Sequence, residues 1–232
     1  MKIWAILPAA GIGRRMGSST PKQYLTVCGT PVLLHSINRL LEIPEIEHLV
    51  VALHPEDEYW ENLGFYSERV SSITGGEERF NSVLNALNAL DGKAQADDWV
   101  LVHDAVRPCV SKADIRNLID QLGHGEVGGL LATPVNNTVK QAGADRQVIR
   151  TLDRSDLWAA LTPQMFRYQL LRDALARAVE AGLEVTDEAS AIEALGLAPE
   201  LVTGSSSNIK ITREEDLKLA EFILTTGDFA DE

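Results

Sequence analysis

Residues 2–17 read KIWAILPAAGIGRRMG, an apolar run that leads directly into a loop of small residues, glycines and cations. Lys2–Leu7 is predicted to form a buried strand, because the run is short, rich in aliphatic side chains and closed by a proline. Glycine and alanine in the following loop allow a ligand to approach the backbone closely. In an α/β domain the loop after the first strand lies where ligands bind, so this stretch predicts both the fold class and a site.

The same alternation of short apolar runs and longer amphipathic segments continues along the chain. The apolar runs predict further strands at His48–Leu53, Val70–Thr74, Trp99–His103, Gly128–Thr133 and Glu200–Thr203. The amphipathic segments predict helices at Val32–Glu42, Glu56–Tyr66, Arg79–Leu90, Lys112–Leu122, Tyr168–Ala181, Glu188–Leu195 and Glu214–Thr225. This order predicts an α/β fold with a mostly parallel, doubly wound sheet, in which ligands bind near a topological switch point.

Residues 134–152 depart from this alternation. They contain Asn136-Asn137, Gly143 and two short alternating runs, which together predict a β-hairpin arm. An isolated hairpin is only marginally stable in water, so a second subunit is a natural surface for the arm. We therefore expect a single domain over residues 1–232, with the arm at 134–152 serving dimerisation.

Composition narrows the possible partners. The chain has 232 residues, and its 34 Asp and Glu against 21 Lys and Arg give a formal net charge of −13. Such a field repels nucleic acid, and no apolar run is long enough to span a membrane, so we expect neither partner and a cytoplasmic location. Cys28 and Cys109 lack the spacing of a zinc site; buried thiols are expected, with a disulfide as the alternative.

The loop from Pro8 to Lys22 concentrates positive charge in an otherwise acidic chain. Arg14, Arg15 and Lys22 accompany glycines whose backbone N–H groups can bind phosphate oxygens, which favours an anion site over a loop of solvated cations. A Walker A loop requires Gly-Lys-Ser/Thr, which is absent from the sequence. A dinucleotide-binding fingerprint requires a small residue where Met16 stands. It also requires an acidic residue at the end of the second strand, which here ends at Leu53-His54, so a dehydrogenase is disfavoured.

Three further stretches carry polar residues suited to this chemistry. Asp104 follows the predicted strand Trp99–His103 and is a candidate Mg²⁺ ligand, while His103 is expected to have a structural hydrogen-bonding role. Arg107 either pairs with Asp104 or binds an anion. The stretch GGEERFNS at 75–82 offers backbone donors between a strand and a helix, and Lys210 is expected on a short strand before the last helix.

Taken together, these motifs resemble those of the 2-C-methyl-D-erythritol 4-phosphate cytidylyltransferases of the non-mevalonate isoprenoid pathway. The matching stretches span residue 3 to about residue 224 in the family's order: PAAGIGRRM, TPKQYL, GGEERFNSV, HDAVRPC, LDRSDLW, ALTPQMF, VTDEASAIE and SNIKITREEDL. The resemblance implies a Rossmann-like nucleotidyltransferase fold, a homodimer with exchanged β-arms, and Mg²⁺. It also implies that CTP and 2-C-methyl-D-erythritol 4-phosphate are joined into 4-diphosphocytidyl-2-C-methyl-D-erythritol with release of pyrophosphate.

The resemblance further implies roles for individual residues. Those implied for the nucleotide are Pro8, Ala9, Ala10 and Gly11 along its length, Arg15 and Lys22 at its phosphates, and Gly76 and Ser82 at its cytosine. Asp104 is implied as the Mg²⁺ ligand beside the second substrate, with Ala105 and Arg107 next to it. The residues implied for the second substrate are Thr138 and Lys140 on the arm, Arg154 reaching the other subunit's substrate phosphate, and Thr162, Thr186 and Lys210 in the same pocket.

Two other functions compete with this one. D-ribitol 5-phosphate cytidylyltransferases have a similar loop and a similar motif around the aspartate, so ribitol 5-phosphate is the alternative acceptor. A non-catalytic, nucleotide-sensing module on the same fold is a different class of protein. Loss of the carboxylate or of a lysine would be expected there, whereas Asp104, Lys22 and Lys210 are all present.

Overall fold

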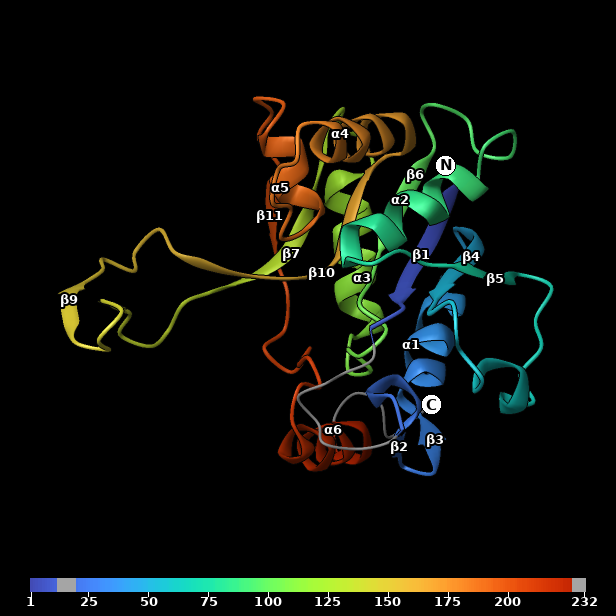
Figure 1. Cartoon of the computed structure of the whole chain (residues 1–232), viewed down its shortest axis with the longest axis horizontal. Coiled ribbons are helices and arrows are strands. Elements are labelled where there is room, and N and C mark those ends of the chain that lie inside the picture. The colour runs from blue at the N-terminus through green and yellow to red at the C-terminus, as the bar shows by residue number, and fades with distance from the viewer. Residues whose placement is uncertain (12–19, 227–232) are drawn as a thin grey trace.

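One seven-stranded sheet forms the centre of the molecule (Figure 1). The structure is a computed structural model that describes residues 1–11 and 20–226. The strand order β11-β7-β10-β6-β1-β4-β5 comprises Glu200–Thr203, Gly128–Pro134, Trp158–Arg167, Trp99–Val102, Ile3–Ala9, Ile46–Leu53 and Val70–Thr74. Only β10 runs antiparallel to its neighbours in this sheet, β6 and β7. The prediction of a mostly parallel α/β sheet is confirmed.

Helices cover both faces of the sheet, as a doubly wound fold requires. One face carries α1 (Val32–Leu41) and α3 (Lys112–Leu122), and the other carries α2 (Arg79–Ala89), α4 (Tyr168–Glu180) and α5 (Glu188–Glu193). Ile3, Ala5 and Leu7 of β1 are buried on the first face, whereas Trp4 and Ile6 of the same strand are buried on the second. Because β1 is apolar on both sides, it anchors the centre of the sheet and holds the loop that follows it.

Further elements lie outside the central sheet and its covering helices. They are the 3-10 helix η2 (Lys22–Tyr24), the hairpin of β2 (Thr26–Val27) and β3 (Thr30–Pro31), the 3-10 helix η3 (Trp60–Leu63) and the last helix α6 (Glu214–Thr226). Ala220 of α6 packs with Val27 and the buried Cys109 in a separate small core. Cys28 and Cys109 are both free thiols, and Cys28 is exposed, so the expectation that both are buried is wrong for Cys28.

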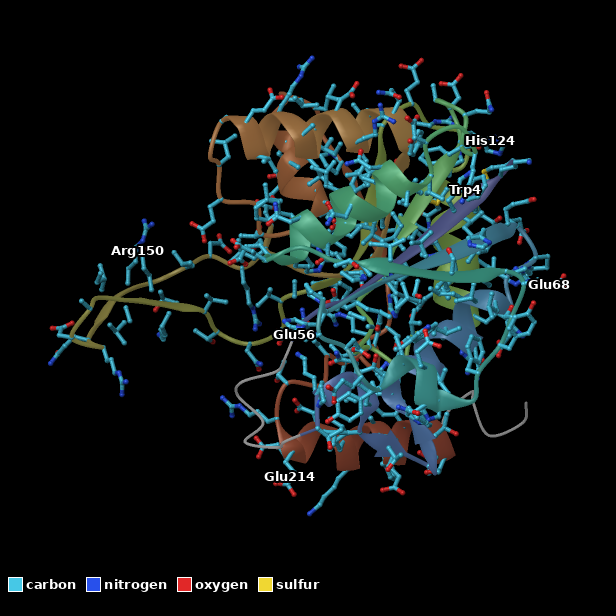
Figure 2. The ribbon with its side chains drawn as sticks, turned by 45° about the vertical axis from the view of Figure 1, so that its right-hand side comes forward. Trp4, Glu56, Glu68, His124, Arg150 and Glu214 are labelled. Carbon is cyan, nitrogen blue, oxygen red and sulfur yellow. The ribbon has the colours of Figure 1, made fainter. Side chains whose placement is uncertain are left out.

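The predicted hairpin arm is present. It consists of β8 (Lys140–Ala142) and β9 (Val148–Thr151), which pair antiparallel and project far from the body of the molecule (Figure 1). Figure 2 shows Arg150 on this arm, away from the sheet. Val148 and Ile149 are 61% and 65% exposed, which is unusual for aliphatic side chains on a strand.

Two predicted elements are wrong. The helix expected at Glu56–Tyr66 is only the short η3, because the Asp57 carboxylate accepts the N–H groups of Tyr59 and Trp60 and Gly64 then adopts a left-handed φ of 62°. The short strand expected around Lys210 is absent: residues 208–212 form a loop, which is attached to the body where the Ile211 N–H donates to the Val106 carbonyl.

The strand β10 is missing from the sequence-based prediction. Its register against β7 shifts between Ala160 and Gln164, and Pro163 lies within that irregularity. Proline within a run normally argues against a strand, which explains why the period-two pattern is hidden here. Within the described residues, no helix is long and apolar enough to cross a membrane.

Candidate active site

An open pocket lies where β1 and β6 end side by side. In the sheet, β1 has β4 and then β5 on one side and β6 on the other. The chain therefore changes direction across the sheet at β1 and β6, and the pocket lies at this topological switch point. Ten of the predicted site residues line the pocket: Pro8, Ala9, Ala10, Gly11, Lys22, Gly76, Ser82, Asp104, Ala105 and Lys210. A pocket therefore lies at the edge of the sheet where the sequence predicts a ligand site.

The loop after β1 and the short helix η2 meet on one side of the pocket. The buried Gln23 side chain donates from Nε2 to the Ala9 carbonyl at 2.8 Å, which attaches η2 to the end of β1. This places Lys22 at the pocket, where its ammonium group also reaches the Ile211 carbonyl at 3.4 Å. Arg15 belongs to residues 12–19, which lie outside the described residues.

A turn between β5 and α2 closes the pocket on another side. The Ser82 hydroxyl is buried and accepts the Gly76 N–H at 3.0 Å. A Cβ atom on Gly75 would lie 2.8 Å from the Cβ atom of Ala10, so only glycine permits this close approach of the turn to the first loop. The backbone of the turn therefore faces the pocket beside Ala10.

Asp104 lies at the centre of a cluster of cations. Lys210 Nζ is 2.8 Å from its Oδ2, Arg79 Nε is 2.9 Å from its Oδ1, and Arg107 Nε is 3.4 Å from its Oδ2. Burial acts to raise the pKa of this carboxyl, but Arg79, Lys210 and Arg107 together hold it well below its usual range. Asp104 is therefore ionised at neutral pH, and its buried carboxylate is a candidate ligand for a cation.

A chain of hydrogen bonds supports Asp104 from below. Its N–H donates to the Thr162 hydroxyl at 3.1 Å, and that hydroxyl lies 3.0 Å from His103 Nδ1. His103 Nε2 lies 3.0 Å from the Arg107 carbonyl, which can only accept, so Nε2 carries the proton and Nδ1 accepts from Thr162. Burial lowers the pKa of His103 to about 4, so its ring is neutral and structural, as predicted.

The remaining predicted residues lie outside the pocket lining. Arg107 pairs with Asp104 and donates to the Asn208 carbonyl at 2.7 Å, so of the two alternatives open for it the structure has the ion pair. Thr138, Thr186 and Arg154 are exposed, and Arg154 donates to the Asn136 carbonyl at the base of the arm. These three residues are not part of the pocket lining.

Arg79 and Glu188, two charged residues that contact each other beside Asp104, were given no role from the sequence. Arg79 is the first residue of α2 and lines the pocket, and Glu188 is the first residue of α5 and is fully buried. Arg79 donates from Nη1 and Nη2 to the two Glu188 carboxylate oxygens at 2.7 and 3.1 Å. The sequence did carry a signal for this pair: Glu188 is a carboxylate on an otherwise apolar helix face. Such a group is buried only when it has a partner, so a cation could have been expected beside it.

The fold and the pocket define a class: a Rossmann-like α/β nucleotidyltransferase with cationic side chains at the switch point. The family model described as "IspD: 2-C-methyl-D-erythritol 4-phosphate cytidylyltransferase" matches residues 3–226. Proteins of that name from Hahella chejuensis and Vibrio vulnificus are each 50% identical to this chain, covering 96% and 95% of it and 93% and 94% of the relatives. The crystal structure of the Francisella tularensis protein of that name superposes with a TM-score of 0.85 at 39% identity, covering 97% of this chain and 100% of that one.

The chain therefore belongs to the 2-C-methyl-D-erythritol 4-phosphate cytidylyltransferase family, and the resemblance inferred from its motifs is confirmed.

Proposed function

We propose that this chain transfers the cytidylyl group of CTP to 2-C-methyl-D-erythritol 4-phosphate, giving 4-diphosphocytidyl-2-C-methyl-D-erythritol and pyrophosphate for non-mevalonate isoprenoid biosynthesis. The observation that carries the proposal is the meeting of Lys22, Lys210 and the buried Asp104 with the small-residue loop Pro8–Gly11 in one pocket. Cations on both sides of a pocket suit a reaction between two anions. We also place the reaction in the cytoplasm.

The reaction needs positioning more than proton transfer. The nucleophile is a phosphate monoester, whose second pKa is about 6, so it is already a dianion at neutral pH. One of its oxygens attacks the α-phosphorus of CTP, and the bond from that phosphorus to the β-phosphate oxygen breaks as pyrophosphate leaves. His103 is neutral, but both its ring nitrogens are engaged below the pocket, which fits a reaction without a general base.

Lys22 and Lys210 approach the pocket from different elements and therefore suit different phosphates. Lys22 lies beside the loop after β1, so we assign it, with Arg15, to the triphosphate and the departing pyrophosphate. Lys210 comes from the loop before α6, beside Asp104, and we assign it to the acceptor phosphate at the point of attack. Preorganised cations of this kind stabilise charge that develops in the transition state.

We further propose that the enzyme uses Mg²⁺. Such an ion usually takes one or two carboxylates and fills its shell with phosphate oxygens and water. One buried carboxylate, Asp104, beside a phosphate-binding pocket fits that requirement, and the described residues hold no cluster of three or more His, Cys, Asp or Glu that would suit an all-protein site. When bound, the ion would neutralise phosphate charge, and Asp104 would have to share its oxygens with Lys210.

We also propose a homodimer in which each arm crosses to the other subunit. The exposed aliphatic residues Val148 and Ile149 on the arm, and the marginal stability of a free hairpin, support a surface that is covered in the working enzyme. In that arrangement Arg154 enters the partner's site and binds the acceptor phosphate, with Thr138 nearby. Thr162 and Thr186 complete the acceptor site in the chain that supplies Lys210.

The preferred acceptor distinguishes this function from its nearest alternative, a D-ribitol 5-phosphate cytidylyltransferase. Purified protein with CTP and Mg²⁺ is given either 2-C-methyl-D-erythritol 4-phosphate or D-ribitol 5-phosphate, and pyrophosphate release is followed. We expect kcat/KM to be at least about 100-fold higher with the erythritol compound, because a site built to bind particular hydroxyl groups discriminates strongly. A preference for ribitol 5-phosphate would overturn the assignment, and CTP binding without turnover of either would indicate a nucleotide sensor.

A further inference from the structure

Arg79 joins three separate elements at the pocket. It begins α2, and its guanidinium contacts Asp104, which follows β6, and Glu188, which begins α5. Its Nε donates to Asp104 Oδ1 at 2.9 Å, while Nη1 and Nη2 donate to the Glu188 carboxylate oxygens at 2.7 and 3.1 Å. The guanidinium plane is thus held on two edges by two carboxylates.

Glu188 is the member of this set that lies behind the pocket lining. Its side chain is 0% exposed and does not line the pocket, whereas Arg79 and Asp104 both do. A buried carboxylate is costly unless it is paired, and the fork of an arginine matches two carboxylate oxygens in a way that lysine does not. Glu188 therefore fixes the plane of the Arg79 guanidinium, and the remaining Nε–H points at Asp104.

This arrangement determines how Asp104 is presented. With Oδ1 bound to Arg79, the carboxylate is not free to rotate, and Oδ2 is directed at Lys210 at 2.8 Å. Because Glu188 accepts from both Nη groups of Arg79, the Nε–H of Arg79 is directed at Asp104 Oδ1, and Oδ2 is left to Lys210 and Arg107. A small rotation of Asp104 would move the oxygen on which both of these depend.

From these contacts we infer that Glu188 is a positioning residue for the reaction, which acts through Arg79 to hold the Asp104 carboxylate in its working orientation. The inference rests on the proposed function, because it assigns a task to Asp104 in that reaction. Glu188 contributes no contact to the substrate. A purely structural ion pair would only stabilise the link between the starts of α2 and α5, and it would leave the rate of the folded enzyme unchanged.

The test compares Glu188→Gln and Arg79→Lys with the wild type, using CTP, 2-C-methyl-D-erythritol 4-phosphate and excess Mg²⁺ well below the melting temperature. Misplacement of a catalytic group by about 1 Å can cost about 100-fold, so we expect kcat to fall about 10- to 100-fold in each variant. KM for CTP should stay within about threefold of the wild-type value, because the loop after β1 is unaltered.

A matched control is Asp91→Asn, which removes the acidic partner of Arg172 near the other end of α2. These two groups lie 3.2 Å apart, away from the pocket, so kcat should be unchanged in this variant.

A double-mutant cycle distinguishes positioning from stability. If Glu188 acts only through Arg79, Glu188→Gln should change kcat by less than about twofold in an Arg79→Gln background. The inference is overturned if Arg79→Lys keeps kcat within about twofold of the wild type, a result that stands even if the Glu188 variant fails to fold. It is also overturned if Glu188→Gln lowers only the melting temperature. Failure of the proposed function would be distinct, because the wild type itself would then not turn over this acceptor.

Discussion

The ammonium group of Lys210 lies 2.8 Å from the Asp104 carboxylate, so the loop before α6 and the end of β6 meet in one ion pair. This ion pair involves a lysine that we assign to a substrate phosphate. The acceptor must therefore take Lys210 from Asp104, or share it. Because the Lys210 side chain is 39% exposed, this exchange needs no opening of the core.

Replacing Lys210 by alanine should lower turnover without unfolding the protein. Loss of a preorganised donor at developing charge commonly costs about 10² to 10³ in rate, and we expect Lys210→Ala to fall in that range. The check is steady-state pyrophosphate release together with the circular dichroism spectrum. Lys218→Ala, which removes an exposed lysine on α6, serves as the control and should leave turnover unchanged. Near-normal turnover of the Lys210 variant would remove this residue from the mechanism.

Mixing the variants Lys22→Ala and Arg154→Ala tests whether the arms are exchanged between subunits. Each alanine variant alone should be nearly inactive, because Lys22 is assigned to its own chain's site and Arg154 to the partner's site. In a re-equilibrated equimolar mixture, half the dimers are mixed and each holds one intact site, so activity should recover to about a quarter of the wild type.

The outcome of that mixing is decisive for the arm. If both residues served the same chain's site, the mixture would be no more active than the variants measured separately. Sedimentation of each variant confirms the dimer before mixing. A control variant, Ile149→Asp on the arm, should weaken the dimer, because it places a charge on an aliphatic surface that we expect to be covered.

Asp104 should determine the metal requirement. Asp104→Asn keeps the size of the side chain but removes the charge, so we expect turnover to fall at least about 100-fold and the Mg²⁺ concentration for half-maximal rate to rise. Mn²⁺ binding followed by electron paramagnetic resonance, with CTP present, provides a readout independent of activity. Unchanged Mn²⁺ affinity and an unchanged Mg²⁺ dependence in this variant would show that Asp104 is not a metal ligand.

Because the His103 ring is buried in its neutral form, the folded protein should be less stable in mild acid than at neutral pH. Its ring would take up a proton near its usual pKa of 6.5 in the unfolded chain, whereas burial lowers the folded pKa to about 4. The unfolded state therefore binds more protons between these values, so the stabilisation is complete above pH 6.5 and is lost as pH falls toward 4. From pH 7 to pH 5 the free energy of unfolding should drop by about 2 kcal/mol from this group.

Urea unfolding at the two pH values, for the wild type and for His103→Gln, isolates this contribution. All other titrating groups are common to both proteins, so the difference between their pH dependences belongs to His103. Parallel curves would contradict the assignment of a neutral, buried ring.

Local patterns were sufficient to predict much of this molecule. β1 and its loop were visible because an apolar run precedes small residues, and Asp104 was visible because it follows a buried strand. The hairpin arm was predicted from alternation around Gly143. Each of these features depends on residues that are neighbours in the sequence, which is where periodicity and turn chemistry carry information.

What could not be predicted depends on contacts between distant parts of the chain. β10 was hidden because Pro163 interrupts it, and its place between β6 and β7 depends on the sheet order. The pair formed by Arg79 and Glu188 links two helix starts that are brought together only by the sheet beneath them. The loop that carries Lys210 has no strand of its own, so its position depends on bonds to Val106 and Arg107.

The most direct test of the central claim follows the α-phosphorus of CTP. The purified protein is incubated with Mg²⁺, 2-C-methyl-D-erythritol 4-phosphate and CTP that is radiolabelled at the α-phosphorus, and the products are separated by anion-exchange chromatography. We predict that the label moves into a cytidine product joined to the acceptor through a diphosphate, with one unlabelled pyrophosphate released for each product formed. Label that stays in CTP, or that appears only in CMP or CDP, would contradict the account.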